Sequence, residues 1–586
     1  MTEHFEVRDR DGAARVGELR LADPVATPAV ADSFLVDAGS AWPAERAVPE
    51  GDAAALTVLP HRGLPAGTEP EVAAAFAPEV PDVDYPAAAV VSPETAADLG
   101  VDAYVLSGTP GLVGHASAFV DALVTVREAI PDDAALYAPG VATPATLPLL
   151  AYAGVDLVDA DRAVVRGTQG RYLTPEGETR LGDLEELPCA CPACLDGRDS
   201  FDREACVEHN RHALRAATAR VRSRIRSGTL RDYLEGQARH APWPTAALRG
   251  FDQQWGYLEA RTPVFRATTM RATTSDALHR PEVQRFADRV TSRYRARFDD
   301  RPLLLVPCSA GKPYGESKSH SRFQDAAGYR AHKVSLTSPL GVVPRELELT
   351  YPAQHYDAAV TGEWSADEVA FVGDVLDRYL DRADYPRVVA HVPAGGYRRA
   401  VERALADRDL PVEWTVADHP TDDDSLSALA DALAGAETVP VSAHEHATVR
   451  AVADYQFGDG AGDALFPAFE TSGRHPKQRA VVRGEQVAAL VPEYGLLALT
   501  LAGARRWVDS DVPVRRVAID DFVPRGSVLA PGVTAADESI RPGDEVVFEG
   551  PSAFGVGRAT AHGEAMVQST RGVVVQPRHV SERTDD

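Results

Sequence analysis

The sequence has few cysteines, few lysines and no long apolar run. Only five of its 586 residues are Cys, too few for a scaffold held by disulfides. No run approaches the roughly 18 apolar residues of a membrane-spanning helix. The N-terminus, MTEHFEVRDRDG, lacks the basic and apolar regions of a secretory signal. These absences predict a cytoplasmic protein with no membrane partner.

Lysine occurs only at positions 312, 318, 333 and 477, and the other 56 basic residues are Arg. Acidic residues outnumber basic ones by 87 to 60, which gives a net charge of −27. This composition is typical of a salt-rich cytoplasm, where carboxylates hold water and salt screens their repulsion; the alternative is an ordinary acidic protein. Two of the four lysines fall within seven residues, which indicates chemistry or anion binding there.

The residue pattern divides the chain into four parts, as a prior of about 150 residues per domain suggests. With 44% hydrophobic residues, the chain can bury several cores. Short β-type runs alternate with helical runs in the first part, which favours a parallel sheet or barrel. Residues 206–239 are predicted to be helical, and 303–307, 387–393 and 487–507 to be strands. The predicted domains are a barrel-like domain over 1–275, a central α/β domain over 276–432, a small α+β domain over 433–507 and a small β-barrel over 508–586.

Three of the five cysteines lie within six residues. Cys189, Cys191 and Cys194 form C-x-C-x-x-C, and His209 follows in the segment EHNRH. Three thiolates and one imidazole complete a tetrahedral zinc site that leaves no position for water, so the zinc is predicted to be structural. His212 is the alternative fourth ligand, and Cys206 is expected to be buried outside the site.

The loop PCSAGKPYGESKSH, residues 307–320, follows a buried strand and lacks the glycine spacing of a Walker A motif. Ligands of open α/β sheets bind beyond the carboxyl ends of the strands. Cys308 is a candidate nucleophile if Lys312 or His320 lowers its pKa, and His320 is a candidate proton shuttle. Lys312 and Lys318 could hold a carboxylate or phosphate. The alternative is an anion-binding loop whose Cys faces the core. The predicted catalytic set of this loop is Cys308, Ser309, Lys312, Tyr314, Ser317, Lys318 and His320.

The stretch over 337–364 is rich in Pro, Tyr and Glu and follows the loop closely. Its polar side chains are predicted to line the same pocket. The predicted substrate-binding residues are Pro344, Arg345, Glu346, Tyr351, Tyr356 and Asp357, with His355 as a further candidate.

The N-terminal part resembles the catalytic domain of tRNA-guanine transglycosylases. The similarity lies in the C-x-C-x-x-C…HN pattern and in residues 140–174, and it implies a TIM barrel with an inserted zinc site. Asp159 then stands at the nucleophile position, after Val158 in place of the usual Phe. Leu106 stands where the family has a second Asp, which implies that the barrel binds a base or tRNA without exchanging the base. The alternative is that Asp159 is only a polar residue at a strand end.

The central stretches closely resemble the archaeosine synthase family, archaeal paralogues of the transglycosylases. The similarity lies in PCSxxKPYxxSxSH, SPLGVVPRELE and YPAxxYDxxVTGxW. It implies addition of a nitrogen donor, free lysine, to the nitrile of a cyano-deazaguanine base (preQ0) in the D-loop of tRNA; older descriptions give glutamine as the donor. A radical-SAM lyase partner then cleaves the adduct to an amidine.

The residues suit such an addition, since attack on a nitrile leaves negative charge on nitrogen and needs a proton donor. His320 or Tyr314 is expected to transfer the proton, while Lys312 or Lys318 orients a carboxylate or phosphate. The donor amine attacks directly, or Cys308 first forms a thioimidate; direct attack is the preferred hypothesis. Two rival functions remain open, an active transglycosylase and a non-catalytic tRNA-binding protein.

The C-terminal part resembles a PUA domain, a small RNA-binding β-barrel. The similarity lies in GSVLAPGV, RPGDEVVF, GVGRA and RGVVVQPRH, in that order. It implies contacts with RNA phosphates. The candidate contacts are Arg525, Arg571, Arg578 and His579. The similarity to transglycosylases, which commonly dimerise, also suggests a homodimer.

Overall fold

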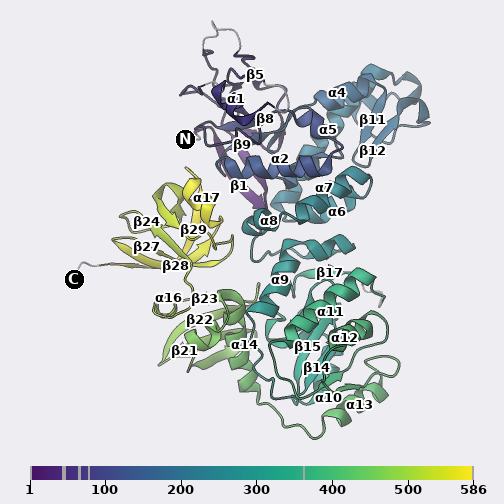
Figure 1. Cartoon of the computed structure of the whole chain (residues 1–586), viewed down its shortest axis with the longest axis vertical. Helices are drawn as coiled ribbons and strands as arrows, with labels where there is room; N and C mark the ends of the chain where they lie inside the picture. The colour runs from purple at the N-terminus through teal and green to yellow at the C-terminus, as the bar shows by residue number, and fades with distance from the viewer. Residues whose placement is uncertain (1–2, 42–47, 64–67, 77–78, 360–362, 584–586) are drawn as a thin grey trace. The chain divides into compact units, whose positions relative to one another are not determined.

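The computed structural model describes residues 3–41, 48–63, 68–76, 79–359 and 363–583 (Figure 1). The chain divides into two compact units. Unit 1 contains residues 1–262, 529–533 and 561–574, and unit 2 contains residues 263–528, 534–560 and 575–586. The four-domain division stays a prediction.

Unit 1 is built around a seven-stranded parallel sheet, in the spatial order β4-β10-β9-β8-β7-β6-β5. β10 pairs with β4, which precedes β5 in the chain, so the strand order is that of a barrel with a seam between β4 and β5. The predicted TIM-barrel-like fold is therefore confirmed as an incomplete barrel. The strands are β4 (Ala29–Val30), β5 (Leu35–Asp37), β6 (Leu56–Val58), β7 (Ala87–Val91), β8 (Ala103–Leu106), β9 (Ala135–Tyr137) and β10 (Leu157–Val158).

Helices of unit 1 pack mainly against strands β7 to β10 of this sheet. α2 buries Phe119, Leu123 and Val126, spaced about one helical turn apart along one face. The helical structure predicted over 206–239 is confirmed as two helices, because Gly228 takes a φ of 62° and separates α5 from α6. The helices are α1 (Pro70–Ala75), α2 (Ala116–Ala129), α3 (Leu147–Tyr152), α4 (Asp161–Thr168), α5 (Arg203–Arg226), α6 (Leu230–Ala238), α7 (Pro242–Asp252) and α8 (Trp255–Arg261).

Two smaller antiparallel elements complete the main part of unit 1. One is a three-stranded sheet of β1 (Phe5–Asp11), β2 (Ala14–Leu19) and β3 (Val25–Ala26). The other is the hairpin of β11 (Arg171–Thr174) and β12 (Gly177–Arg180), which contacts α4 and α5.

The central sheet of unit 2 has the order β16-β15-β14-β18-β19, and only β16 is antiparallel. The apolar run LLLVP forms β14 at its centre. Leu303 and Leu305 pack in the core with α9, α11 and α12, whereas Leu304 and Val306 pack with α10 and α13 on the other face. The strands are β14 (Leu303–Pro307), β15 (His332–Thr337), β16 (Gly341–Pro344), β18 (Val388–Ala390) and β19 (Val412–Trp414); the helices are α9 (Pro281–Ser292), α10 (Lys318–Ala327), α11 (Ala366–Leu380), α12 (Gly396–Leu405) and α13 (Asp423–Leu433).

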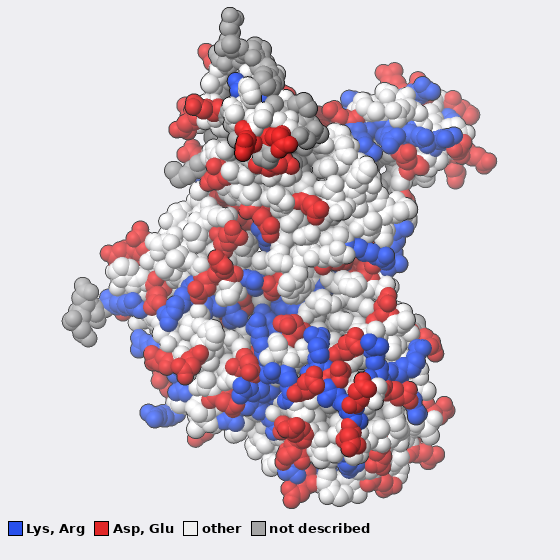
Figure 2. Space-filling model, viewed as in Figure 1, with Lys and Arg blue, Asp and Glu red and all other residues white. Residues whose placement is uncertain are grey.

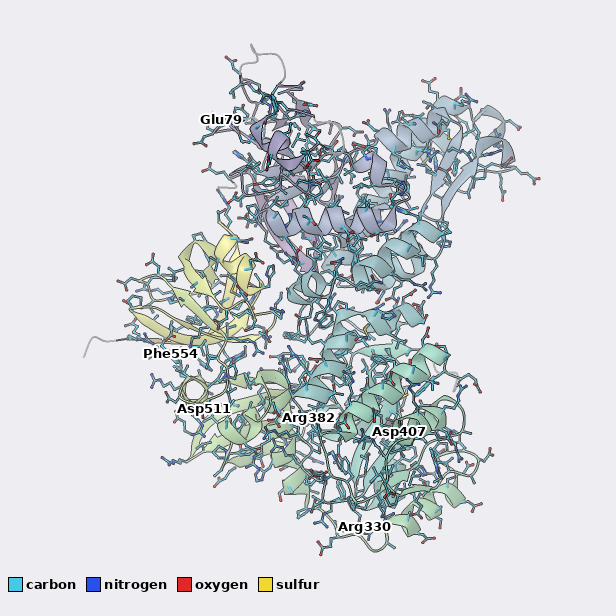
Figure 3. The ribbon with its side chains drawn as sticks, viewed as in Figure 1. Glu79, Arg330, Arg382, Asp407, Asp511 and Phe554 are labelled. Atoms are coloured by element: carbon cyan, nitrogen blue, oxygen red, sulfur yellow. The ribbon has the colours of Figure 1, made fainter. Side chains whose placement is uncertain are left out.

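An α+β segment follows in unit 2, and it holds a four-stranded antiparallel sheet. The single strand predicted over 487–507 is wrong: Gly495, at φ 66°, turns the chain between β22 and β23, and Thr500 then caps α16. Arg382, labelled in Figure 3, joins this segment to α11 by donating to Asp459 over 2.8 Å. The elements are α14 (Val441–Phe457), α15 (Ala461–Leu465), β20 (Glu470–Arg474), β21 (Lys477–Val482), β22 (Glu485–Val491), β23 (Leu496–Leu499) and α16 (Leu501–Val508).

The C-terminal strands form a six-stranded sheet in the order β25-β29-β28-β27-β24-β26, as expected for the predicted small β domain. Its elements are β24 (Arg516–Ile519), β25 (Val528–Leu529), β26 (Val533–Ala536), β27 (Glu545–Glu549), β28 (Ala553–Ala559) and β29 (Val573–Glu582), with α17 (Gly563–Gln568) before the last strand. A parallel pair of short strands, β13 (Met270–Ala272) and β17 (Tyr356–Ala358), lies in unit 2.

Surface charge follows the composition. Figure 2 shows Asp and Glu spread widely over the visible face, while Lys and Arg gather in patches between them. Among the described residues, none of the helices combines the length and the apolar character needed to cross a membrane.

Candidate functional site

A pocket opens at the carboxyl ends of β14 and β18 in unit 2. From β14 the chain runs outward to β15 and β16, and then returns on the other side of β14 to form β18 and β19. Such a switch point is where open α/β sheets bind ligands. The pocket is small and is lined by Cys308, Ser309, Ala310, Lys312, Ser338, Tyr356, Asp357, Ala358, Ala359, Trp364 and Tyr397.

Cys308 is part of the pocket lining, and it also packs against the core of unit 2. Its Sγ lies 3.1 Å from the hydroxyl of Tyr397, at the start of α12. Burial raises the pKa of Tyr397, and the neighbouring Cys308 adds to the rise. Tyr397 therefore keeps its proton at neutral pH and can donate a hydrogen bond into the pocket.

Lys312 brings a cation to the same pocket. Its Nζ lies 4.0 Å from the centre of the Tyr356 ring, a cation–π contact. Burial lowers the pKa of Lys312, against the opposing effect of Cys308 and Asp357. The hydroxyl of Tyr356 is 2.5 Å from that of Tyr314 and 2.6 Å from that of Thr337, so the ring under the ammonium is held in place.

His320 lies beneath the pocket and outside its lining. Its side chain is buried, and its Nε2 donates to the carbonyl of Pro307 over 3.0 Å. Burial and the neighbouring Lys333 together lower the pKa of His320 to about 3, against the opposing effect of the hydrogen bond to Pro307. A neutral ring that already uses its proton in this bond is better suited to hold the loop than to shuttle protons.

The other predicted residues of the loop are separated by the structure. Ser309 lines the pocket. Ser317 caps α10 by accepting from the backbone N–H of His320, and Tyr314 is buried. Lys318, the first residue of α10, is exposed and outside the lining.

Of the predicted substrate-binding residues, Tyr356 and Asp357 line the pocket, and the remaining four lie elsewhere. Glu346 is buried, 3.1 Å from Nε2 of His332 and 3.1 Å from the hydroxyl of Tyr294. Burial acts to raise the pKa of Glu346, but the His332 ring lowers it to about 2. Glu346 therefore belongs to a buried network. The other residues outside the lining are Pro344, Arg345 and Tyr351, and the further candidate His355 is also outside it.

Sequence reasoning missed six lining residues: three alanines, Ala310, Ala358 and Ala359, and three with larger or polar side chains, Ser338, Trp364 and Tyr397. A signal existed for Tyr397, because it closes the segment AGGY directly after the strand predicted over 387–393. The rule that strand carboxyl ends meet at one edge of a parallel sheet could have placed it beside Cys308.

Asp159, at the strand end after β10 in unit 1, is enclosed by hydrogen bonds. Its carboxylate accepts from the hydroxyl of Tyr137 at 2.9 Å and from the backbone N–H groups of Gly140 at 2.7 Å and Asp161 at 3.1 Å. Burial raises the pKa of Asp159. Leu106, which the resemblance to transglycosylases aligns with a second Asp, is fully buried in β8.

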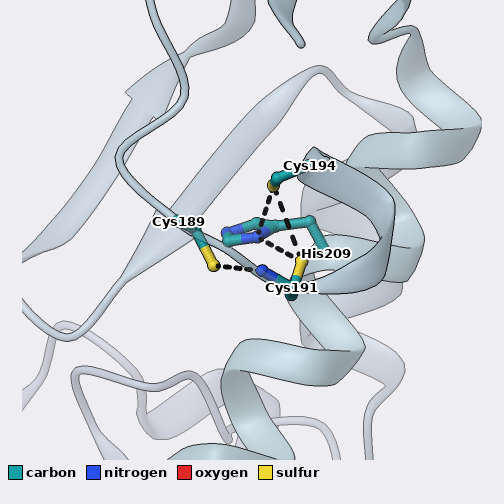
Figure 4. A group of neighbouring side chains, drawn as sticks. All are labelled: Cys189, Cys191, Cys194 and His209. Carbon is teal, nitrogen blue, oxygen red and sulfur yellow. Dashed lines mark hydrogen bonds between the residues drawn. The ribbon is translucent and has the colours of Figure 1, made fainter. Parts of the chain in front are cut away.

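The four predicted metal ligands come together in unit 1 (Figure 4). Their ligand atoms lie within 4.8 Å of one another, with Nδ1 of His209 at 3.5 Å from the Cys191 sulfur and 3.4 Å from the Cys194 sulfur. Ligands in tetrahedral zinc sites with bonds of about 2.3 Å lie ~3.8 Å apart, so the cluster could bind zinc. Nε2 of His209 donates to the carbonyl of Leu173 over 2.9 Å, which leaves Nδ1 unprotonated toward the sulfurs.

Cys206 and His212 lie outside this cluster. Cys206 is buried, and its thiol donates to the carbonyl of Arg171 over 3.3 Å. Among the described residues, His212 is likewise absent from the group that could hold a metal.

The predicted RNA contacts differ in their availability. Arg525, Arg571 and His579 are exposed. Arg578 is instead paired with the buried Glu545, with Nη2 donating to Oε2 over 3.0 Å, and it also donates to the carbonyl of Leu499. Arg578 thus ties the C-terminal sheet to β23.

Four family models match the chain. They are described as queuine tRNA-ribosyltransferase at residues 84–242, a domain of unknown function at 283–433, the patch-forming domain C2 of tRNA-guanine transglycosylase at 447–513, and the PUA domain at 511–581. The metal cluster falls within the first match and the pocket within the second.

Similar proteins cover the whole chain. An archaeosine synthase from Haloferax volcanii is 57% identical over 100% of both chains. An archaeosine synthase subunit alpha from Methanosarcina acetivorans is 40% identical over 99% of this chain and 100% of the relative. A tRNA-guanine(15) transglycosylase from Methanothermobacter thermautotrophicus is 27% identical over 78% of this chain and 68% of the relative.

Proposed function

The chain belongs to the archaeosine synthase family, and on that premise we propose that it adds a nitrogen donor to the nitrile carbon of a cyano-deazaguanine base in the D-loop of tRNA. The observation that carries this proposal is the pocket at the carboxyl ends of β14 and β18. It places Cys308, Lys312 and Tyr397, which suit nucleophilic addition, around one small cavity.

The donor in this proposal is free lysine. Lys312 offers a fixed positive charge to the carboxylate of an amino acid or to a phosphate of the tRNA. The adduct then passes to a radical-SAM lyase partner, which cleaves it so that the base keeps the amidine group. A second component fits the naming of the relative from Methanosarcina acetivorans as a subunit alpha.

Two routes lead to the same product. In direct attack, the donor nitrogen bonds to the nitrile carbon, and one amine proton passes to the nitrile nitrogen. In the covalent route, Cys308 sulfur bonds to that carbon and its proton passes to the nitrile nitrogen; the amine then displaces the thiol and forms the amidine. The preference for direct attack assumed a core-facing thiol. The position of Cys308 in the lining favours the covalent route.

The charge that develops on nitrogen during the addition needs a donor nearby. Tyr397 provides a hydroxyl beside the Cys308 sulfur, and burial keeps it protonated. We assign it the role predicted for His320 or Tyr314, because it lines the pocket and those two do not.

Zinc at Cys189, Cys191, Cys194 and His209 has a structural role in this proposal. The four ligands fill a tetrahedral ion, so zinc would brace the segment between β12 and α5 and supply no reactive water. Metal analysis should give about one zinc per chain, and Cys191→Ser should lower this content. Full metal content in that variant would contradict the assignment.

Binding of tRNA is assigned to the C-terminal domain, where Arg525, Arg571 and His579 are exposed. The experiment that tests the function is nucleoside mass spectrometry. The purified protein is incubated, in high salt, with tRNA that carries the cyano-deazaguanine base and free lysine. A nucleoside heavier by one lysine supports the proposal. If the base stays unchanged when lysine, glutamine and ammonia are each supplied as the donor, the proposal is contradicted.

The rival function is base exchange in unit 1. Asp159 already accepts three hydrogen bonds, and Leu106 occupies the place of a second carboxylate. Labelled guanine should therefore not enter tRNA in the presence of this protein, and its incorporation would restore the transglycosylase reading.

A further inference from the structure

Lys333, in β15, is a buried lysine in a chain that has only four. Its relative exposure is 5%, and it lies outside the pocket lining. Burying an ammonium is costly unless nearby groups compensate it. The carboxylates of Glu348 and Glu346 attract this charge, while Arg345 repels it. Such a costly group calls for a role that an apolar residue could not fill.

The ammonium of Lys333 contacts the ring of His320. Its Nζ lies 3.4 Å from Nδ1, while Nε2 of the same ring lies 3.0 Å from the carbonyl of Pro307. A carbonyl only accepts, so Nε2 carries the proton and Nδ1 has a lone pair. An ammonium only donates, so Lys333 fits this tautomer and opposes the other one.

The His320 ring in turn fixes the backbone that carries Cys308. The peptide between Pro307 and Cys308 is held at both ends, because the N–H of Cys308 donates to the carbonyl of Leu336 over 3.1 Å. The orientation of this peptide sets where the Cys308 side chain begins, and hence how its sulfur faces Tyr397.

A second contact leads from the same ring to the pocket. His320 stacks on Tyr314 with ring centres 5.1 Å apart and planes 17° apart. The hydroxyl of Tyr314 is hydrogen-bonded to that of Tyr356, and the ring of Tyr356 makes the cation–π contact with Lys312. The state of one buried ring thus affects both the sulfur and the cation of the pocket.

We propose that Lys333 is a positioning residue for Cys308, acting through His320: it holds the ring as a donor to the Pro307 carbonyl and so fixes the reactive loop. The inference rests on the proposed function for its readout in turnover. It adds a residue that neither touches the pocket nor belongs to the loop 307–320.

The test uses the full chain with Lys333→Met, which removes the donor, and Lys333→Gln, which keeps a neutral donor. We expect Lys333→Met to lower kcat by about tenfold and to change KM by less than about threefold. Lys333→Gln should recover much of the lost kcat. The rate at which iodoacetamide alkylates Cys308 is followed by peptide mass spectrometry across pH. We expect the Lys333→Met profile to differ from wild type and the Lys333→Gln profile to approach it.

A double-mutant cycle separates positioning from general stability. His320→Gln keeps a donor for Pro307 but loses the ring nitrogen that faces Lys333 and the rigid ring itself, so Lys333→Met should have little further effect in that background. Independent, multiplicative losses would overturn the inference, as would a wild-type kcat and alkylation profile in Lys333→Met. If Lys333→Met does not fold by circular dichroism, Lys333→Gln and His320→Gln still report alkylation. If the wild-type protein makes no product, the proposed function is contradicted, but the positioning role of Lys333 can still be tested. Alkylation of Cys308 does not depend on turnover, so its rate remains a valid readout.

Discussion

Unit 1 and unit 2 each have a large sheet of mainly parallel strands with polar residues at a strand end, and the two strand ends differ. In unit 2, Cys308, Lys312 and Tyr397 surround a pocket at the ends of β14 and β18. In unit 1, the carboxylate of Asp159 after β10 is enclosed by three donors. The same topological rule points to both places, but only one leaves its reactive groups facing open space.

The difference shows that a reactive residue at a strand end is not sufficient for chemistry. A nucleophile must have a lone pair directed at substrate, and each hydrogen bond that Asp159 accepts uses one direction of attack. Within the described part of the chain, the Cys308 sulfur has one hydrogen-bond partner, the Tyr397 hydroxyl, which stays protonated. The proposed function therefore assigns the chemistry to the pocket of unit 2 and not to the strand end of unit 1.

Removal of the Cys308 thiol is expected to have the largest effect on product formation. Cys308→Ala should lower product formation by a factor of about 10³ or more, because the covalent route loses its nucleophile. Product is measured by nucleoside mass spectrometry. Cys308→Ser controls for volume and should remain strongly impaired. Turnover close to wild type in Cys308→Ala would exclude the covalent route and favour direct attack.

The two lysines of the loop give the next contrast. Lys312→Met should lower kcat/KM by about 10- to 100-fold, since a charge-assisted hydrogen bond contributes about 1.5–3 kcal/mol. Lys318→Met is the matched variant, because Lys318 is exposed and outside the lining. Equal losses in the two variants would show that the lining does not identify the residues that work.

The sequence predicted the parts of the site that are local. The uninterrupted apolar run at 303–307 predicts a strand buried on both faces, and the polar loop after it contains Cys308 and Lys312. The spacing of Cys189, Cys191, Cys194 and His209 likewise specifies a ligand set. In both cases, the residues that act together are close along the chain, so pattern and chemistry agree.

Long-range partners could not be predicted in the same way. Tyr397 lies 89 residues from Cys308 and meets it only because β18 pairs with β14. Periodicity also does not say which side of α10 faces the sheet, so His320 was expected in the pocket and lies beneath it. Gly495 turns the chain within a segment whose composition alone predicts one strand, and Gly228 divides the predicted helical stretch into two helices.

The buried ring of His320 should give the strand end in unit 2 a pH dependence. Its pKa is about 3 in the folded chain and about 6.5 when unfolded, so between these values the unfolded state binds one more proton. Stability from this group is therefore lost as pH falls from about 6.5, by up to about 1.4 kcal/mol per pH unit. The stability difference between wild type and His320→Gln, from urea unfolding, should shrink by on the order of 3 kcal/mol between pH 7 and pH 4. A difference that stays constant with pH would contradict the buried, neutral ring.

The smallest effect on activity is expected at Asp159. Asp159→Asn keeps the shape of the side chain, but one amide oxygen cannot accept all three donors. Unfolding should therefore cost about 1–3 kcal/mol less than in wild type. Addition to the nitrile should change less than about twofold, because the residue is hydrogen-bonded in unit 1 and absent from the pocket lining. Urea unfolding and nucleoside mass spectrometry, run side by side, measure both effects. A large loss of product with unchanged tRNA binding would break the comparison, since it would make the strand end of unit 1 part of the chemistry.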